Sequence, residues 1–190
     1  FAFHSAMNFL GTHDTPRILT VLGADHVPET REARAAFRLS PDQRAKGVAL
    51  VRLAALILFT FPGSPTIFYG DEAGMEGFED PFNRGTYPWG HEDRELLGHF
   101  ARLGTLRRSR SALQKGTLSW IAANGPLLAF AREGADGRLV TVVNADRAEQ
   151  RLSLPWSGDT ATDLLTGQEF FPEAGVLTLC IPPRGGFLLG

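Results

Sequence analysis

Two short polar groups have residue types suited to acid–base or hydroxyl-binding chemistry, and each is tied to an apolar, strand-like segment. Thr12-His13-Asp14 follows residues 6–10, and Gly70-Asp71-Glu72 follows the β-rich run 66–69. In a βα unit, the loops that carry chemistry come directly after the strands. Two such units in succession predict part of a barrel built from parallel strands.

The segments around these groups have the spacing that βα units require. Ser40-Pro41-Asp42 supplies an N-cap, a first-turn proline and an early acid, so a helix should begin there. Apolar residues cover most of that helix, which should therefore be heavily buried. Residues 74–91 show no periodicity, and long loops of that kind often carry function. The predicted helices are 17–22, 29–39, 42–59 and 93–110.

The character of the sequence changes near Leu113, after which short β-rich segments alternate with turns such as Asn124-Gly125-Pro126. This spacing predicts a small antiparallel β-sandwich. Trp120 lies at a period-two position and should belong to its core, whereas Trp156 follows a strand end and could be exposed. The predicted strands are 118–122, 127–132, 139–144, 150–154, 161–164 and 176–181.

Composition excludes several classes of function. The formal charge is −2, with 19 basic and 21 acidic residues, and the basic residues form no patch for nucleic acid. The longest apolar segment, 48–61, contains Arg52 and favours a buried helix over a membrane span. No Cys/His cluster, glycine-rich phosphate loop or nucleophile elbow is present, so we expect no metal and no cofactor. Cys180, the lone cysteine, should be a buried thiol and leaves the compartment open, with the cytoplasm favoured.

Two longer strings resemble the α-amylase family of retaining glycoside hydrolases, most closely its neopullulanase, cyclomaltodextrinase and maltogenic amylase branch. They are residues 8–17 (NFLGTHDTPR) and 61–75 (FPGSPTIFYGDEAGM). The resemblance implies that residues 1–112 form the last βα units of a TIM (β/α)₈ barrel, and that 113–190 form the C-terminal β-sandwich. The implied parent enzyme hydrolyses α-glucosidic bonds in malto-oligosaccharides, cyclomaltodextrins or pullulan.

In that family the nucleophilic Asp and the acid/base Glu lie on barrel strands that precede these strings. The sequence begins with Phe1, close to a core strand, and has no initiator Met. We therefore expect a piece of a larger polypeptide that is inactive alone. Its partners would be an α-glucan oligosaccharide and either the upstream part of the same polypeptide or a second copy in a homodimer. Its barrel part should be less stable than its sandwich.

The resemblance assigns roles to the first groups of residues. Asp14 is implied to be the third catalytic carboxylate, which holds sugar hydroxyls in the transition state, and His13 its sugar-binding neighbour. Arg17 matches an arginine of the same string; it either pairs with an acid near the site or is solvated. Asp71 and Glu72 are implied to support the substrate cleft, and a structural role, binding backbone amides or Arg84, stays open.

A second loop, residues 80–89 (DPFNRGTYPW), resembles a family segment in which an arginine precedes Pro-Met-x-Trp, although the Met and the usual spacing are missing. Arg84 is implied to face the substrate. Tyr87 and Trp89 could stack on sugar faces, or they could anchor the loop on the barrel rim.

Two other functions are compatible with the sequence. One is a non-catalytic carbohydrate-binding or interaction module, in which the sandwich does the binding. The other, within the enzyme class, is an α-glucan transferase or a sucrose isomerase, because such enzymes keep the same three carboxylates. Convergence of His13, Asp14 and Arg84 would favour an enzyme, and clustered exposed aromatics on the sandwich would favour the module.

Overall fold

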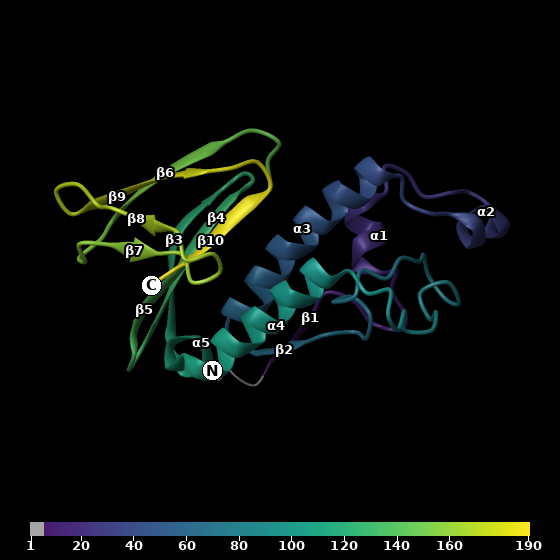
Figure 1. The fold of residues 1–190 in the computed structure, drawn as a ribbon, viewed down its shortest axis with the longest axis horizontal. Coiled ribbons are helices and arrows are strands. Elements are labelled where there is room, and N and C mark those ends of the chain that lie inside the picture. Colours follow the sequence, from purple (N-terminus) through teal and green to yellow (C-terminus); the bar gives the residue numbers. More distant parts are fainter. Residues whose placement is uncertain (1–5) are drawn as a thin grey trace.

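The computed structural model describes residues 6–190 and has a helical region beside a β region (Figure 1). In Figure 1 the β region lies at one end of the molecule and helix α2 at the other. No helix among the described residues is long and apolar enough to cross a membrane. The elements of the helical region are β1 (Met7–Phe9), α1 (Ile18–Gly23), α2 (Arg31–Ala36), α3 (Pro41–Thr60), β2 (Ser64–Thr66), α4 (Arg94–Ser109) and α5 (Ser111–Lys115).

Strands β1 and β2 form a parallel pair, with Met7 opposite Ser64 and Phe9 opposite Thr66. The Asn8 side chain donates to the Pro62 carbonyl at 2.7 Å. Gly63, at φ +115°, is needed beside it, because a Cβ there would lie 2.5 Å from Asn8 Nδ2. The first predicted strand is confirmed. The bounds of the second, 66–69, are wrong: β2 ends at Thr66, and the chain then turns, with Gly70 at φ +88°.

The two long helices follow local sequence rules. Ser40 and Gln43 form a capping box at the start of α3, and Asp93 accepts from the Leu96 N–H at the start of α4. From residue 47 to the end of α3, Arg52 alone is exposed, so the prediction of a heavily buried helix is confirmed. Residues 74–91 form neither helix nor strand, as predicted.

The β region consists of antiparallel sheets in two packed layers. A four-stranded sheet, in the order β10-β5-β4-β3, lies against the pair β6–β9, and a short pair, β7–β8, lies beside them. The core between the layers contains Val142 and Ala129 from one and Leu179 and Leu154 from the other. The strands are β3 (Thr117–Asn124), β4 (Leu127–Gly134), β5 (Gly137–Asn144), β6 (Gln150–Pro155), β7 (Ala161–Thr162), β8 (Glu169–Phe170), β9 (Val176–Ile181) and β10 (Gly185–Leu189).

Sequence reasoning missed α5, β8 and β10, and it misplaced two side chains. Trp120 is 58% exposed, because β3 is an edge strand with a register irregularity between Trp120 and Ala122 that disturbs the alternation of faces. Cys180 is exposed, because β9 buries only its alternate residues, Leu177, Leu179 and Ile181. Trp156, for which the sequence leaves exposure open, is half-buried, and its indole N–H donates to the Thr160 carbonyl.

The two regions share a core. Leu53 and Leu56 of α3 belong to the same buried cluster as Val143 and Leu188 of the β region. Arg132 of β4 is fully buried and donates to the Thr60 carbonyl at the end of α3. Helix α5 contains the proposed boundary at 112/113. It contacts α4 of the helical region and packs on β4 and β5 of the β region. The β region is therefore attached to the helices by packing as well as by the chain.

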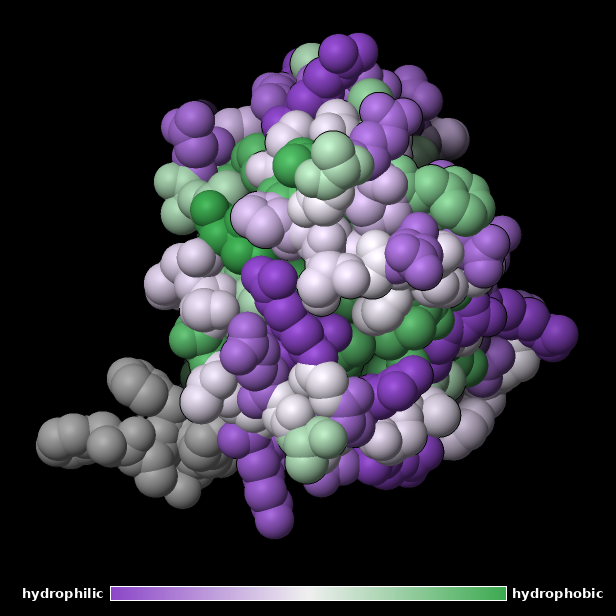
Figure 2. All heavy atoms as spheres, turned by 90° about the vertical axis from the view of Figure 1, so that its left-hand side faces the viewer, coloured by the Kyte–Doolittle hydropathy of each residue, from purple (hydrophilic) through white to green (hydrophobic). Residues whose placement is uncertain are grey.

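The surface at the β-region end is mixed in character. Figure 2 shows hydrophilic residues interspersed with separate apolar areas over this face. Strands β6 and β9 account for part of the mixture, because each alternates between buried and accessible positions.

Candidate functional site

The loop after β1 is a tight turn that presents His13 and Asp14 to solvent. The Thr12 N–H donates to Thr15 Oγ1 at 2.8 Å, and the Asp14 N–H donates to Thr12 Oγ1 at 3.2 Å. These bonds fold the backbone of the loop on itself. The side chains of His13 and Asp14 remain 65% and 72% exposed, with His13 Nε2 3.3 Å from Asp14 Oδ2. The backbone of His13 and Asp14 is thus held in place, while the imidazole and the carboxylate are accessible to a ligand.

A second loop, between β2 and α4, holds the first one in place. Asn83 is fully buried, and its Nδ2 donates at 2.8 Å to the carbonyls of both His13 and Thr15. Arg84 Nε donates to the His13 carbonyl at 3.2 Å, and its Nη2 lies 3.6 Å from Asp14 Oδ1. The same Nη2 is 3.1 Å from Asp80 Oδ2. His13, Asp14 and Arg84 therefore lie together.

A buried ion pair joins the segments that follow the two parallel strands. Arg17 Nη1 is 3.2 Å from Asp71 Oδ1, and both side chains are almost completely buried. The Arg17 guanidinium lies 4.2 Å from the Phe68 ring centroid and 4.7 Å from that of Tyr69. Its Nε donates to the Asn83 carbonyl at 2.7 Å. Of the two alternatives for Arg17, the structure shows pairing with an acid.

Burial outweighs the attraction of Arg17 in the electrostatics of Asp71. Desolvation raises the pKa of its carboxyl to about 6, although the hydrogen bond and charge of Arg17 act in the opposite direction. Asp71 does not meet Arg84, whose acidic neighbours are Asp14 and Asp80. The suggested contact between Arg84 and Asp71 is therefore not formed.

The remaining predicted residues also belong to the second loop. Glu72 accepts from the Gly70 N–H at 2.9 Å, the backbone-amide contact that was left open for it. The rings of Tyr87 and Trp89 lie 4.6 Å apart, and Trp89 is 80% exposed. The pKa of Tyr87 is raised, mainly by partial burial and then by the charges of Glu72 and Glu92. An exposed indole beside a half-buried phenol can offer a flat apolar face to a ligand.

Two residues of this arrangement were not assigned roles from the sequence. Asn83 and Asp80 belong to the loop string 80–89, which drew attention only to its arginine and aromatics. The buried position of Asn83 and the contact of Asp80 with Arg84 depend on the folded loop. Among residues 6–190, no group of three or more His, Cys, Asp or Glu side chains is placed to hold a metal ion.

Comparisons with known proteins agree with the motifs. The family model described as "Maltogenic Amylase, C-terminal domain" matches residues 121–188. The chain is a relative of the α-amylase-family glycoside hydrolases. An amylopullulanase from Thermoanaerobacter thermohydrosulfuricus is 34% identical over 98% of this chain, and a cyclomaltodextrinase from Geobacillus thermopakistaniensis is 34% identical over 95%.

The structural comparison extends over both regions. The debranching enzyme from Nostoc punctiforme superposes with a TM-score of 0.75 and 27% identity, covering 98% of this chain and 35% of that one. The chain spans only 13% of the amylopullulanase and 28% of the cyclomaltodextrinase. The α-amylase-family likeness thus includes the helical region with its two loops as well as the β region.

Proposed function

We propose that this chain is part of a retaining α-amylase-family enzyme that hydrolyses α-glucosidic bonds in malto-oligosaccharides, cyclomaltodextrins or pullulan. Within it, Asp14 stabilises the transition state, and polypeptide outside these 190 residues supplies the nucleophile and the acid/base. The observation that carries the proposal is the convergence of Asp14, His13 and Arg84 on one exposed site. The backbone of this site is held by the hydrogen bond from the buried Asn83 to the His13 carbonyl.

The chemistry follows from the groups that are free at this site. Asp14 can accept hydrogen bonds from sugar hydroxyls, and His13 can donate to one. Such bonds accelerate the reaction when they strengthen as the sugar approaches its oxocarbenium-like transition state. A carboxylate held by a turn and an arginine loses little freedom on binding, which favours this role. The proposed mechanism therefore gives Asp14 a larger part in turnover than in initial binding.

The other residues divide into those that can touch a sugar and those that support the loops. Trp89, Tyr87, Glu72 and Arg84 are accessible and would form the wall of the substrate site. Arg17 and Asp71 are 1% and 3% exposed, so we assign them to positioning the His13–Asp14 loop rather than to contact with substrate. Their ion pair would fix the relation between the two strand ends.

The parallel strands support a barrel as the setting of this site. On β1, Met7 is 62% and Phe9 48% exposed, although both are apolar. A nearby apolar hollow of about 230 Å³ is lined by β1 and the following Leu10, and by α3, including Ile57, and the following Phe61. We propose that further strands of a (β/α)₈ barrel cover these surfaces, with residues 1–112 as its last units and 113–190 as a C-terminal β-sandwich.

One observation favours the alternative of a carbohydrate-binding module. Trp120 is exposed on the β region, and its ring lies 6.0 Å from that of Phe61 and 5.8 Å from that of Phe130. An exposed indole of this kind can bind a sugar face. In the module, Trp120→Ala would remove binding to maltoheptaose and Asp14→Asn would not; the enzyme proposal expects the reverse.

The direct test uses a polypeptide that joins this chain to the proposed upstream barrel. Asp14→Asn should lower kcat on maltotriose by on the order of 100-fold or more, with a much smaller change in KM. Asp80→Asn is the matched control, because it removes another carboxylate that contacts Arg84, and it should cost about 10-fold or less. Near-normal kcat in the Asp14→Asn enzyme would assign Asp14 to structure.

The chain of 190 residues should release no glucose from maltotriose. Clear turnover by a preparation that mass spectrometry shows to begin at Phe1 would place the nucleophile and the acid within this sequence, and would remove the reason for treating Asp14 as the third carboxylate.

A further inference from the structure

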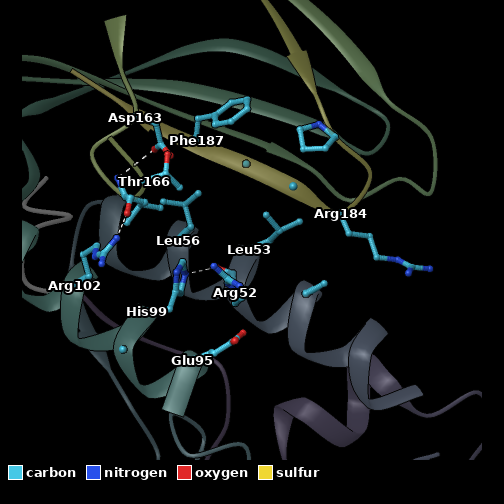
Figure 3. A pocket seen from close by; sticks show the side chains of 16 residues that line it. Arg52, Leu53, Leu56, Glu95, His99, Arg102, Asp163, Thr166, Arg184 and Phe187 are labelled. Atoms are coloured by element: carbon cyan, nitrogen blue, oxygen red, sulfur yellow. Dashed lines mark hydrogen bonds between the residues drawn. The ribbon is translucent and has the colours of Figure 1, made fainter. Parts of the chain in front are cut away.

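A cleft of about 540 Å³ separates the long helices from the β region, and none of the His13–Asp14 site residues lines it. Its helical wall comes from α3 and α4, and its other wall comes from the turn after β7 and the start of β10 (Figure 3). The floor is apolar, with Leu53, Leu56 and Phe187. Known small-molecule sites have a similar size and combine an apolar floor with a few placed polar groups.

Three arginines give the cleft its charge. Arg52, Arg102 and Arg184 line it, and none of them forms an ion pair with a side chain of residues 6–190, whereas Arg17, Arg34, Arg44 and Arg84 all do. Arg102 is oriented by donating to the Leu165 carbonyl, which leaves other N–H groups of its guanidinium for a ligand. In Figure 3 the Arg184 side chain extends away from the other labelled side chains. Arg52 and Arg102 are the cations that lie beside His99.

Two carboxylates also line the cleft, and they differ in burial and in hydrogen bonding. Asp163 is 1% exposed, and its oxygens accept from the backbone N–H groups of Leu165 and Leu188 and from Thr166 Oγ1. Its charge is thus satisfied inside the turn. Glu95 is exposed at the rim of the cleft. The cleft therefore keeps a positive balance with one carboxylate that can accept from hydroxyl groups.

His99 adds a neutral polar group in the middle of the cleft. Its Nε2 lies 3.0 Å from the Arg52 carbonyl, which can only accept, so Nε2 carries the hydrogen and Nδ1 is left as an acceptor. Burial lowers the pKa of His99 to about 4, so the ring is neutral at pH 7. A neutral acceptor between cations suits a ligand that carries hydroxyl groups as well as negative charge.

Gly98 keeps the helical wall open. It lies inside α4, where glycine is unfavourable relative to alanine, yet a Cβ at this position would meet no atom of residues 6–190 within 4 Å. Packing therefore gives no reason for glycine here. A larger side chain would project into the cleft that Gly98 lines.

We propose that this cleft is a binding site for a small hydroxylated anion of the size of a sugar phosphate. The guanidinium groups of Arg52 and Arg102 would bind the anionic group, His99 and Glu95 would accept from hydroxyls, and the apolar floor would take the carbon skeleton. The site does not depend on the proposed glycosidase function, since its residues and ligand are separate from those of the His13–Asp14 loop.

Isothermal titration of the 190-residue chain with glucose 6-phosphate, glucose, gluconate and inorganic phosphate tests the proposal. Glucose 6-phosphate should bind with a dissociation constant of about 1 mM or tighter, and binding should weaken as salt is added. Equally tight binding of gluconate would support the proposal, because gluconate is also a small hydroxylated anion, and would show that a phosphate group is not required. Glucose binding as tightly would refute the role of the arginines, and inorganic phosphate binding as tightly would refute that of the hydroxyl acceptors.

Variants of matched chemistry locate the site. Arg52→Gln should weaken glucose 6-phosphate binding about 10-fold, whereas Arg108→Gln, which removes the same charge from α4 outside the cleft, should change it less than about 2-fold. Gly98→Leu should abolish binding by filling the cleft. Gly98→Ala and Gly104→Ala are the controls for helix propensity and should retain binding. The proposal is overturned if glucose 6-phosphate does not bind at about 10 mM, which is 10-fold above the expected dissociation constant. It is also overturned if Arg52→Gln and Gly98→Leu leave the binding unchanged.

Discussion

The β region and the helical region bury their apolar residues to different degrees. In the β region, Leu154, Leu179 and Ile181 close a core between two layers and are at most 1% exposed. In the helical region, β1 leaves Met7 and Phe9 accessible, and the residues suited to chemistry lie on loops beside it. The comparison separates two tasks: the β region has its own closed core, and the helical region presents a site and an open apolar edge.

The difference is also electrostatic. The helical region buries the ion pair Arg17–Asp71 next to its exposed loops. Among residues 6–190, buried polar atoms without a hydrogen-bond partner lie in both regions: Arg17 Nη2 and Asn83 Oδ1 in the helical region, and Arg132 Nε and Thr141 Oγ1 in the β region. Buried charges and unpaired polar atoms are unfavourable unless the geometry around them compensates. The core between the layers of the β region is instead made from aliphatic and aromatic side chains. The loops of the site are thus held by a buried ion pair and hydrogen bonds, which add less to the free energy of unfolding than apolar packing does.

The largest expected effect is on the core of the β region. Leu179→Ala should lower the free energy of unfolding by about 3 kcal/mol, since Leu179 is fully buried and the change leaves a cavity. Guanidinium titration followed by circular dichroism measures the change. Thr178→Ala, at an exposed neighbouring position of β9, is the control and should cost less than about 1 kcal/mol. Equal losses would mean that the core of the β region is not closed.

A somewhat smaller effect should come from the buried carboxyl of the helical region. The pKa of Asp71 is 3.8 ordinarily and about 6 in the fold, so the folded state binds its proton more tightly than the unfolded state. The stabilisation from this group is complete below pH 3.8 and is lost as the pH rises to about 6. The difference between the two pKa values corresponds to at most about 3 kcal/mol.

Asp71→Asn cannot titrate and isolates this contribution. The free energy of unfolding of the native chain, minus that of the variant, should decrease between pH 4 and pH 7. Guanidinium titrations at a series of pH values measure this difference. Glu72→Gln, which removes the adjacent carboxylate, should leave most of the pH dependence in place. A difference that is flat, or that rises with pH, would show that Arg17 dominates over burial.

The apolar edge of β1 gives a third contrast. Phe9→Thr removes an apolar ring that is 48% exposed and introduces a residue that favours strands, so stability should change by less than about 1 kcal/mol. If this edge associates with another copy, sedimentation velocity should show less self-association in the variant. Phe171→Thr is the control, because Phe171 is 69% exposed but belongs to the β region. Equal effects of the two substitutions would argue against β1 as the associating edge.

Sequence reasoning was most successful where neighbours along the chain decide the structure. The capping box of Ser40 and Gln43 and the cap of Asp93 are local, and both helices begin as predicted. The placement of His13 and Asp14 after a strand also follows from a local pattern. In these cases the determining contacts span three or four residues.

The remainder depends on contacts between distant segments. Asn83 donates to carbonyls 68 and 70 residues away, so its role could not be read from its own loop. The exposure of Trp120 depends on a strand irregularity at a sheet edge. The cleft between the regions requires α3, α4 and the turns of the β region together. His99 stands alone in its part of the sequence, so its type and spacing give no indication of the cleft.

The smallest expected effect on stability is at Cys180, which directly follows the most sensitive position. β9 alternates between buried and exposed residues, so Cys180 lies on the opposite face from Leu179. Cys180→Ser should change the free energy of unfolding by less than about 0.5 kcal/mol. The native thiol should react with a colorimetric disulfide reagent at a rate close to that of the denatured chain. Reaction only after unfolding would return Cys180 to the buried state expected from its apolar neighbours, and would show that both faces of β9 are covered.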